Sequence, residues 1–375
     1  MKQYPLAKPH IGKKEERAVL EVLRSGVLSM GPKVEAFEKR FARFVGTKYA
    51  VAVSSGTAGL HLALIGANIG HGDEVITTPF SFIASANAIL YVGARPVFVD
   101  VDPVTYNMDP KNIEAAITSK TKAILVVHIL GQAASMNAIC AIARKHNLKI
   151  VEDACESIGA TYKVGKKLEQ TVGTFGESAV FAFYPNKQMT TGEGGMIVTN
   201  DQKLDALFRS LRNQGRSADM NWLEHQRLGY NYRLDEMSAA LGLVQLQNIE
   251  TCIRERQKIA TWYQEFLSPY SACVTPPATA AENTHTWFVY TVLLPKDVSR
   301  EKVMKRLEAE GIATKPYLPS IHLFSFYREQ FGFSPGNFPV SELVSNRALA
   351  LPLYIGLKKT EIAFIVKKLI TCISK

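Results

Sequence analysis

The chain opens with two segments, residues 15–23 and 34–44, in which apolar residues recur every three or four positions. This spacing places the apolar side chains on one face of a helix, so we expect two amphipathic helices. From residue 49 the pattern changes to short β-branched runs separated by helical stretches. The expected strands are residues 49–53, 74–77, 96–99, 123–127 and 149–151, and the expected helices between them are 57–67, 82–91, 110–117 and 136–147. Such alternation predicts fold class α/β, with a mostly parallel sheet covered by helices on both faces.

The pattern continues with two more strand-like runs, residues 179–183 and 196–199, which are expected to extend the sheet. A helix is expected over 201–213 and a long helical region over 235–267. Pro269, Pro276 and Pro277 then mark a boundary. We therefore expect a large domain over residues 1–268 and a small C-terminal α+β domain over 269–375. The elements expected in the small domain are strands at 287–294 and 312–314 and helices at 300–310 and 360–373.

Composition narrows the function class. The chain has 375 residues, 47% of them hydrophobic, but no apolar run approaches the ~18 residues that cross a bilayer. The five cysteines are scattered without a Cys-x-x-Cys pair, so we expect a cytoplasmic protein with no disulfide framework and no metal site. The net charge of +10 favours a polyanionic partner. Because no nucleic-acid recognition motif accompanies that charge, a small phosphorylated substrate is the favoured interpretation.

A run of small residues, Ser54-Ser55-Gly56-Thr57-Ala58, joins an expected strand to an expected helix. Glycine allows close approach of the backbone to a ligand, and the first N–H groups of a helix favour a phosphate. The run is therefore a candidate phosphate cradle. The alternative is an ordinary capped turn.

A carboxylate and a lysine follow at two further strand ends. The apolar run that reaches Val151 ends in Glu152 and Asp153, at the sheet edge where open α/β sheets bind ligands. A buried carboxylate there needs a cation, although a structural salt bridge is the alternative. Lys187 follows another expected strand and lies in a Gly- and Thr-rich turn. A desolvated amine loses its proton more easily, so Lys187 is a candidate for imine chemistry, against the alternative of a solvated surface lysine.

Together the cradle, the carboxylate and the lysine supply three fixed points for pyridoxal phosphate (PLP): its phosphate, its ring nitrogen and its aldehyde. The order of these motifs and their residue identities resemble those of the sugar aminotransferase family named DegT/DnrJ/EryC1/StrS, within the aspartate-aminotransferase fold (fold type I) of PLP enzymes. The resemblance covers essentially the whole chain. Its motifs are residues 26–32, 55–58, 72–76, 96–100, 152–157, 183–187, 192–195 and 229–236.

The resemblance implies a role for each matching residue. Lys187 would form the Schiff base with PLP and Asp153 would pair with the pyridinium nitrogen, as the two catalytic residues. The remaining cofactor contacts that it implies are Gly56, Thr57 and Ala58 at the phosphate, Phe82 stacked on the ring, and Glu156 near the ring hydroxyl. Many relatives carry serine where this chain has Ala182, so the resemblance implies one phosphate contact fewer, with a water, Asn231 or a neighbouring backbone N–H as the alternatives that would replace it.

The resemblance also implies partners. Asn231 matches an asparagine that reaches the phosphate from the partner subunit, which implies a homodimer with composite active sites. His322 matches a substrate-binding histidine near the sugar; a surface loop histidine is the alternative. The amino donor would be L-glutamate, and the acceptor a nucleoside-diphosphate sugar with a keto group at C4 or C3. The products would be amino sugars for surface polysaccharide, glycan or antibiotic.

Of two rival functions, one lies within PLP chemistry and one belongs to a different class. A sugar dehydratase of the same family has histidine in place of the lysine, so Lys187 argues against it. A non-catalytic regulator would not need Lys187, Asp153 and the cradle together.

Overall fold

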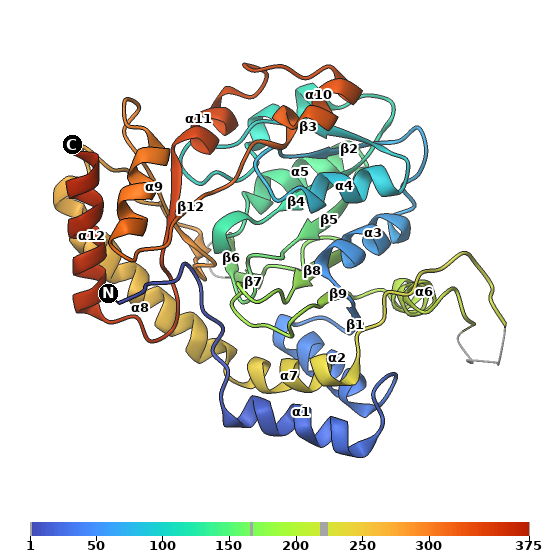
Figure 1. Cartoon of the computed structure of the whole chain (residues 1–375). Helices are drawn as coiled ribbons and strands as arrows, with labels where there is room; N and C mark the ends of the chain where they lie inside the picture. The colour runs from blue at the N-terminus through green and yellow to red at the C-terminus, as the bar shows by residue number, and fades with distance from the viewer. Residues whose placement is uncertain (1, 166–167, 218–223, 375) are drawn as a thin grey trace.

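The computed structural model describes residues 2–165, 168–217 and 224–374. Within these ranges a seven-stranded sheet, in the order β1-β9-β8-β5-β4-β2-β3, forms the centre of the molecule (Figure 1). All neighbours pair in parallel except β9, which runs antiparallel to both β1 and β8. Its strands are β1 (Tyr49–Val53), β2 (Glu74–Thr77), β3 (Arg95–Phe98), β4 (Thr121–Val127), β5 (Lys149–Asp153), β8 (Ser178–Ala182) and β9 (Gly195–Thr199). The expected α/β class is confirmed.

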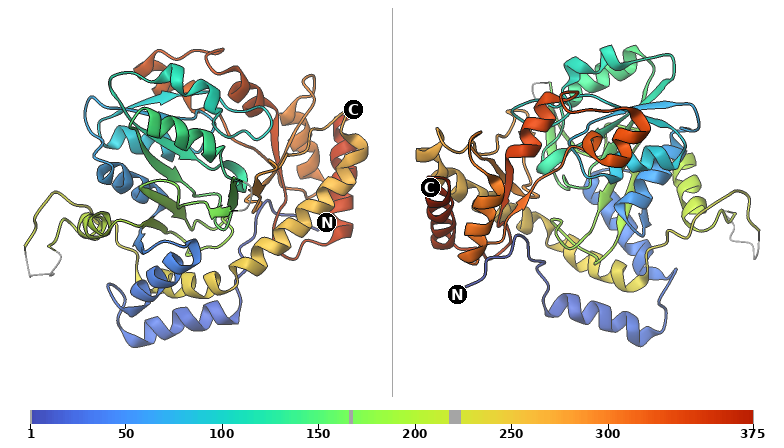
Figure 2. Two further views of the ribbon diagram at one scale, coloured as in Figure 1. Left: turned by 180° about the vertical axis from the view of Figure 1, so that it is seen from behind. Right: turned by 45° about the horizontal axis from the view of Figure 1, so that its top comes forward.

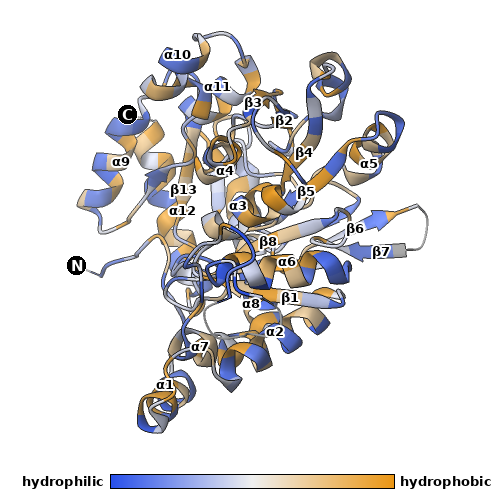
Figure 3. Ribbon diagram, turned by 90° about the vertical axis from the view of Figure 1, so that its right-hand side faces the viewer, coloured by the Kyte–Doolittle hydropathy of each residue, from blue (hydrophilic) through white to orange (hydrophobic). Residues whose placement is uncertain are grey.

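Helices cover both faces of this sheet because successive strand residues point to opposite sides. On β1, Ala50 and Ala52 join one core and Val51 and Val53 join the other. The first core packs under α2 (Pro32–Val45), α5 (Met136–Lys145) and α7 (Glu236–Gln247). The second packs under α3 (Gly56–Gly66), α4 (Ala84–Tyr91) and α6 (Gln202–Arg212). Figure 3 shows apolar residues gathered on the strands between these layers.

A C-terminal lobe, which we define as the sheet β11-β13-β12 with α9 and α12, lies beside the large sheet (Figures 1 and 2). Its elements are β11 (Tyr290–Leu293), α9 (Arg300–Ala309), β12 (Lys315–Pro316), β13 (Ala348–Leu351) and α12 (Lys359–Ile373). Its core also includes Tyr4 and the end of α8 (Ile249–Leu267), whereas Ile249 and Ile253 at the start of α8 belong to a core of the large sheet. The domain boundary at residue 268 stays a prediction.

The segment at residues 4–6 is bonded into the C-terminal lobe. The Tyr4 N–H donates to the Gly311 carbonyl at 2.8 Å, and the Ala313 N–H donates to the Tyr4 carbonyl at 3.0 Å. The Leu353 N–H donates to the Leu6 carbonyl at 3.0 Å. The early chain therefore completes a unit made otherwise from late residues.

The other elements connect these layers. They are α1 (Lys13–Ser25), β6 (Thr161–Val164), β7 (Leu168–Thr171), β10 (Asn283–Thr284), α10 (Ser325–Phe331), α11 (Pro339–Arg347) and the 3₁₀ turns η1 (Pro110–Asn112), η2 (Glu114–Ala116), η3 (Ile129–Gly131), η4 (Ser268–Tyr270) and η5 (Ile321–Leu323). In the described ranges, no helix is both long and apolar enough to cross a membrane.

Three expected elements differ in the structure. Residues 110–117 form the two turns η1 and η2 in place of one helix. The helical region 235–267 is interrupted at Asn248, whose side-chain amide donates to the Val244 carbonyl at 3.3 Å. At the expected strand 312–314, Ile312 forms an isolated bridge with Tyr4, and the strand that pairs with β13 is β12, which begins at Lys315.

Candidate active site

Lys187 lies in the loop between β8 and β9. The base of this loop is closed by the Phe183 N–H, which donates to the Gly194 carbonyl at 2.9 Å, and by the Thr191 N–H, which donates to the Phe183 carbonyl at 3.0 Å. The Lys187 side chain is 14% exposed, with Nζ 3.6 Å from Glu156 Oε1. A nearly enclosed amine thus faces a carboxylate.

Asp153 is the last residue of β5 and is 6% exposed. The Ser85 hydroxyl donates to its Oδ2 at 2.7 Å, and the Cys155 N–H donates to its Oδ1 at 3.2 Å. Among the described residues, no lysine or arginine forms an ion pair with Asp153. A buried carboxylate is costly without a cation, so Asp153 is suited to pair with a positively charged ring.

Glu152 points to the opposite face of the sheet and has a structural role. Its carboxylate accepts hydrogen bonds from the N–H groups of Gly173, Phe175 and Gly176 at 2.7–2.8 Å, and it lies 3.0 Å from His128 Nε2. Four partners satisfy this fully buried side chain. Of the two carboxylates at the end of β5, only Asp153 is left for the site.

The expected phosphate cradle is the N-terminus of α3. Ser55 caps the helix by accepting from the Ala58 N–H at 3.1 Å. A Cβ added at Gly56 would lie 2.7 Å from the Ala182 Cβ and 3.0 Å from the Cys155 Sγ, so the cradle, the residues after β5 and the end of β8 meet at Gly56. The structure therefore brings the cradle together with the segments that carry Asp153 and Lys187.

Glu156 connects the lysine to the C-terminal lobe. Its Oε2 accepts from the Leu130 N–H at 2.9 Å, and its Oε1 accepts from the Tyr317 hydroxyl at 2.5 Å. The Phe288 ring lies 4.0 Å from Lys187 Nζ. Burial, reinforced by the charge of Glu156, raises the pKa of Tyr317 well above its ordinary value, so its hydroxyl remains a donor.

Three other expected contacts have surroundings of their own. Phe82 is 61% exposed, one turn before Ser85. Asn231 is exposed, and its backbone pairs with Asn213. The His322 side chain is fully buried, with Nε2 3.0 Å from Glu342 Oε1. Burial, opposed by Glu342, lowers the His322 pKa. The roles of all three stay predictions.

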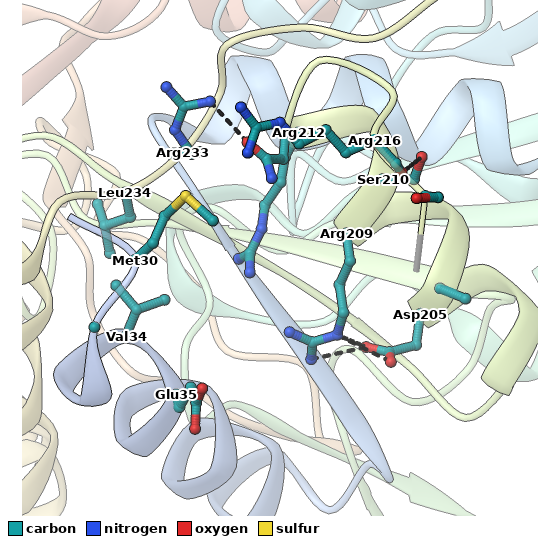
Figure 4. Close-up of a pocket in the computed structure, with 14 residues that line it drawn as sticks. Met30, Val34, Glu35, Asp205, Arg209, Ser210, Arg212, Arg216, Arg233 and Leu234 are labelled. Carbon is teal, nitrogen blue, oxygen red and sulfur yellow. Dashed lines mark hydrogen bonds and ion pairs between the residues drawn. The ribbon is translucent and has the colours of Figure 1, made fainter. Parts of the chain in front are cut away.

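A cavity of about 360 Å³ lies near the Asn231 segment, between α2 and α6 (Figure 4). Its basic side chains are Arg209, Arg212, Arg216 and Arg233. Arg209 is paired with Asp205 and Glu38, Arg212 with Glu38, and Arg233 donates to the Asn213 side chain at 2.8 Å. Through Glu38, the pairings of Arg209 and Arg212 hold α6 against α2.

Sequence reasoning missed three contacts of the cluster. Ser85, Phe288 and Tyr317 touch Asp153, Lys187 and Glu156 respectively, and each is far from its partner along the chain. An ordinary serine or aromatic residue carries no signal of such a contact. In the described ranges, no group of three or more His, Cys, Asp or Glu side chains is placed to hold a metal ion.

The residues present fit PLP. Asp153 offers a charge for the ring nitrogen, Lys187 an amine for the aldehyde, and the N-terminus of α3 backbone donors for the phosphate. The buried amide oxygens of Asn186 and Gln188, on either side of Lys187, have no hydrogen-bond partner within the described chain. These two amide oxygens, in residues adjacent to Lys187 in the chain, are therefore available to accept hydrogen bonds.

Comparisons with known proteins agree with this chemistry. The model of the DegT/DnrJ/EryC1/StrS aminotransferase family matches residues 9–370. The chain is 40% identical over 367 residues to the GDP-perosamine synthase of Caulobacter vibrioides, covering 97% of this chain and 96% of that one. It is 39% identical to a pleiotropic regulatory protein of Geobacillus stearothermophilus, covering 98% and 95%. The PLP form of a putative sugar aminotransferase from Streptococcus pneumoniae superimposes with a TM-score of 0.92 at 27% identity, covering 100% and 99%.

Proposed function

The chain belongs to the DegT/DnrJ/EryC1/StrS aminotransferase family and is a PLP-dependent sugar aminotransferase; we propose that it moves an amino group from L-glutamate to a keto-sugar carried by a nucleoside diphosphate. The observation that carries this proposal is the enclosed amine of Lys187 beside Glu156, together with a buried carboxylate, Asp153, that forms no ion pair with a lysine or arginine of the described chain. The positive net charge suits a substrate with two phosphates.

The bound cofactor supplies an electron sink for the electrons released when the Cα–H bond of the amino donor breaks. We assign the other tasks to this chain. Lys187 would hold the aldehyde and, as a free amine, would move a proton at the donor Cα through Nζ. Asp153 would keep the ring nitrogen protonated. Gly56, Thr57 and Ala58 would hold the phosphate.

We propose further that the active sites are completed across a homodimer. Asn231 is exposed and matches a phosphate ligand from the partner subunit in relatives. Exposed apolar side chains gather on α1 and the turn after it: Leu20, Leu23, Val27, Leu28 and Met30 are 44–51% exposed. Apolar surface of this kind marks protein interfaces. The domain boundary at residue 268 and a cytoplasmic location remain predictions from the sequence.

The residue at position 187 disfavours one of the two rival functions. A dehydratase of this family would have histidine at position 187, and the chain has lysine. The regulatory name of one relative keeps a non-catalytic role as the second candidate. Visible absorption separates the two candidates, because PLP bound to a lysine absorbs visible light whereas a binding protein without PLP is colourless.

Replacement of Lys187 tests the proposal. Lys187→Ala should lose the cofactor bond that borohydride traps, and should lose turnover, because no other amine faces Glu156 at ion-pair distance in the described chain. Mass spectrometry of the trapped protein locates the bond. Covalent PLP on another lysine of Lys187→Ala would contradict the assignment. A panel of nucleotide keto-sugars with glutamate then identifies the acceptor.

A further inference from the structure

Tyr317 and Glu156 join two parts of the molecule at the reactive lysine. Tyr317 follows β12 in the C-terminal lobe, whereas Glu156 follows β5 of the large sheet. The Tyr317 hydroxyl donates to Glu156 Oε1 at 2.5 Å, and Glu156 is 6% exposed. This contact is a short hydrogen bond to a buried carboxyl group, and hydrogen bonds to carboxylates are strong where water is scarce.

The same carboxylate oxygen faces the lysine. Glu156 Oε1 is 3.6 Å from Lys187 Nζ, while Oε2 is occupied by the Leu130 N–H at 2.9 Å. The tyrosine hydroxyl and the lysine amine therefore share one oxygen. A donor to a carboxylate stabilises its negative charge, so the Tyr317 hydroxyl weakens the attraction of Glu156 for a proton on Nζ.

Among the described residues, Glu156 is the carboxylate at ion-pair distance from Lys187 Nζ. The Phe288 ring covers Nζ at 4.0 Å and lies 6.0 Å from the Tyr317 ring, which limits screening by water. Burial raises the pKa of the Cys155 thiol well above its ordinary value, so this neighbour stays neutral. Asp153 is the other carboxylate of the cluster, and it is held by Ser85 and the Cys155 N–H.

We propose that Tyr317 is a positioning residue that sets, through Glu156, how firmly a proton is held on Nζ of Lys187. The inference rests on the proposed function, because it concerns the lysine assigned to the cofactor. Its consequence is that the protonation of the reactive nitrogen depends on how the C-terminal lobe docks. A displacement of that lobe would release Glu156 to hold the proton more tightly.

The test compares Tyr317→Phe with Tyr327→Phe in the PLP-loaded protein. Tyr327 is a matched control, because its buried hydroxyl donates to Asn87 Oδ1 at 2.8 Å, away from Lys187. The measurement is the pH midpoint of the change in visible absorption, with thermal unfolding recorded in parallel. We expect the midpoint to rise by roughly half to one pH unit in Tyr317→Phe and to stay unchanged in Tyr327→Phe.

A second variant, Glu156→Gln, keeps the inference testable if Tyr317→Phe is unstable, because a midpoint that does not fall in Glu156→Gln would also overturn the inference. Glu156→Gln removes the negative charge, so its midpoint should fall, and adding Tyr317→Phe to it should produce no further shift. An unchanged midpoint in Tyr317→Phe, or a shift that persists when Tyr317→Phe is added to Glu156→Gln, overturns the inference and leaves the proposed function intact. If borohydride traps no cofactor on Lys187 of the unaltered protein, the proposed function fails and the inference fails with it.

Discussion

Glu152 and Asp153 are neighbours in the chain with opposite surroundings. Glu152 accepts three backbone N–H groups and lies beside His128, whereas Asp153 accepts one hydroxyl and one N–H group. Alternation along β5 places them on opposite faces of the sheet. The same chemical change at these two positions should therefore have different effects.

Asp153→Asn should slow amino transfer by orders of magnitude, because it removes the charge assigned to the ring nitrogen while preserving the shape of the side chain. The cofactor should still bind through Lys187 and the cradle. The measurement is single-turnover reaction of the loaded protein with saturating glutamate. A rate within about tenfold of the unaltered protein, or ~1.4 kcal/mol of barrier, would assign control of the ring nitrogen to another group.

Glu152→Gln is the matched control, since it makes the same change one residue earlier. Its single-turnover rate should stay near that of the unaltered protein. Its free energy of unfolding should fall by ~1.5–3 kcal/mol, because an amide replaces a charged acceptor of buried hydrogen bonds. Urea unfolding measures that loss.

At the scale of elements, Glu38 ties α2 to α6 and β1. Its carboxylate accepts the Ala52 N–H at 2.9 Å and pairs with Arg209 at 2.7 Å and Arg212 at 2.5 Å. Burial acts to raise the pKa of Glu38, but the charges of Arg212 and Arg209 outweigh it and hold that pKa below the ordinary value. Glu38 therefore contributes stability above the pKa of the unfolded chain, and this contribution is lost as the pH falls through the folded-state pKa.

Glu38→Gln should lower the free energy of unfolding at pH 7 by ~1.5–3 kcal/mol, from lost charged hydrogen bonds. The difference in free energy of unfolding between Glu38→Gln and the unaltered protein should shrink below about pH 4, because the Glu38 carboxyl of the unaltered protein also takes up a proton there. Urea unfolding at a series of pH values measures this trend. Glu35→Gln, an exposed position on the same helix, should show little effect. A loss in free energy of unfolding that does not depend on pH would indicate that Glu38 stabilises the fold through packing and not through its charge.

Some elements of the fold can be predicted from the sequence pattern and others cannot. The strands at 49–53 and 74–77 were predicted at their observed bounds, because β-branched runs between turns give a strong local signal. β13 was missed, since Ala348–Leu351 is made of alanine and leucine, which favour helices. It is a strand because it is buried between β11 and β12. Pairing between distant segments overrode the local helix preference at β13. The contact of Tyr317 with Glu156 also joins residues far apart in the chain, so local sequence gave no signal of it.

At the scale of the whole molecule, the exposed face formed by α1 and the turn after it and the exposed Asn231 favour a dimer with shared sites. Mixed dimers of Lys187→Ala and Asn231→Ala subunits should recover part of the activity that each variant lacks alone, because one of the two sites would then be intact. The measurement is turnover of verified mixed dimers. No recovery in such dimers would indicate a site built from a single chain.

The hydrogen bonds of Tyr4 and Leu6 to Gly311, Ala313 and Leu353 have a consequence during biosynthesis. Tyr4 and Leu6 leave the ribosome long before their partners. At ~5–20 residues per second, the roughly 350 residues between Leu6 and Leu353 correspond to about 20–70 seconds of translation. During that interval the early segment has no native partner, so the C-terminal lobe can close only after β13 has emerged, and a nascent chain stalled before it would present an open edge to chaperones.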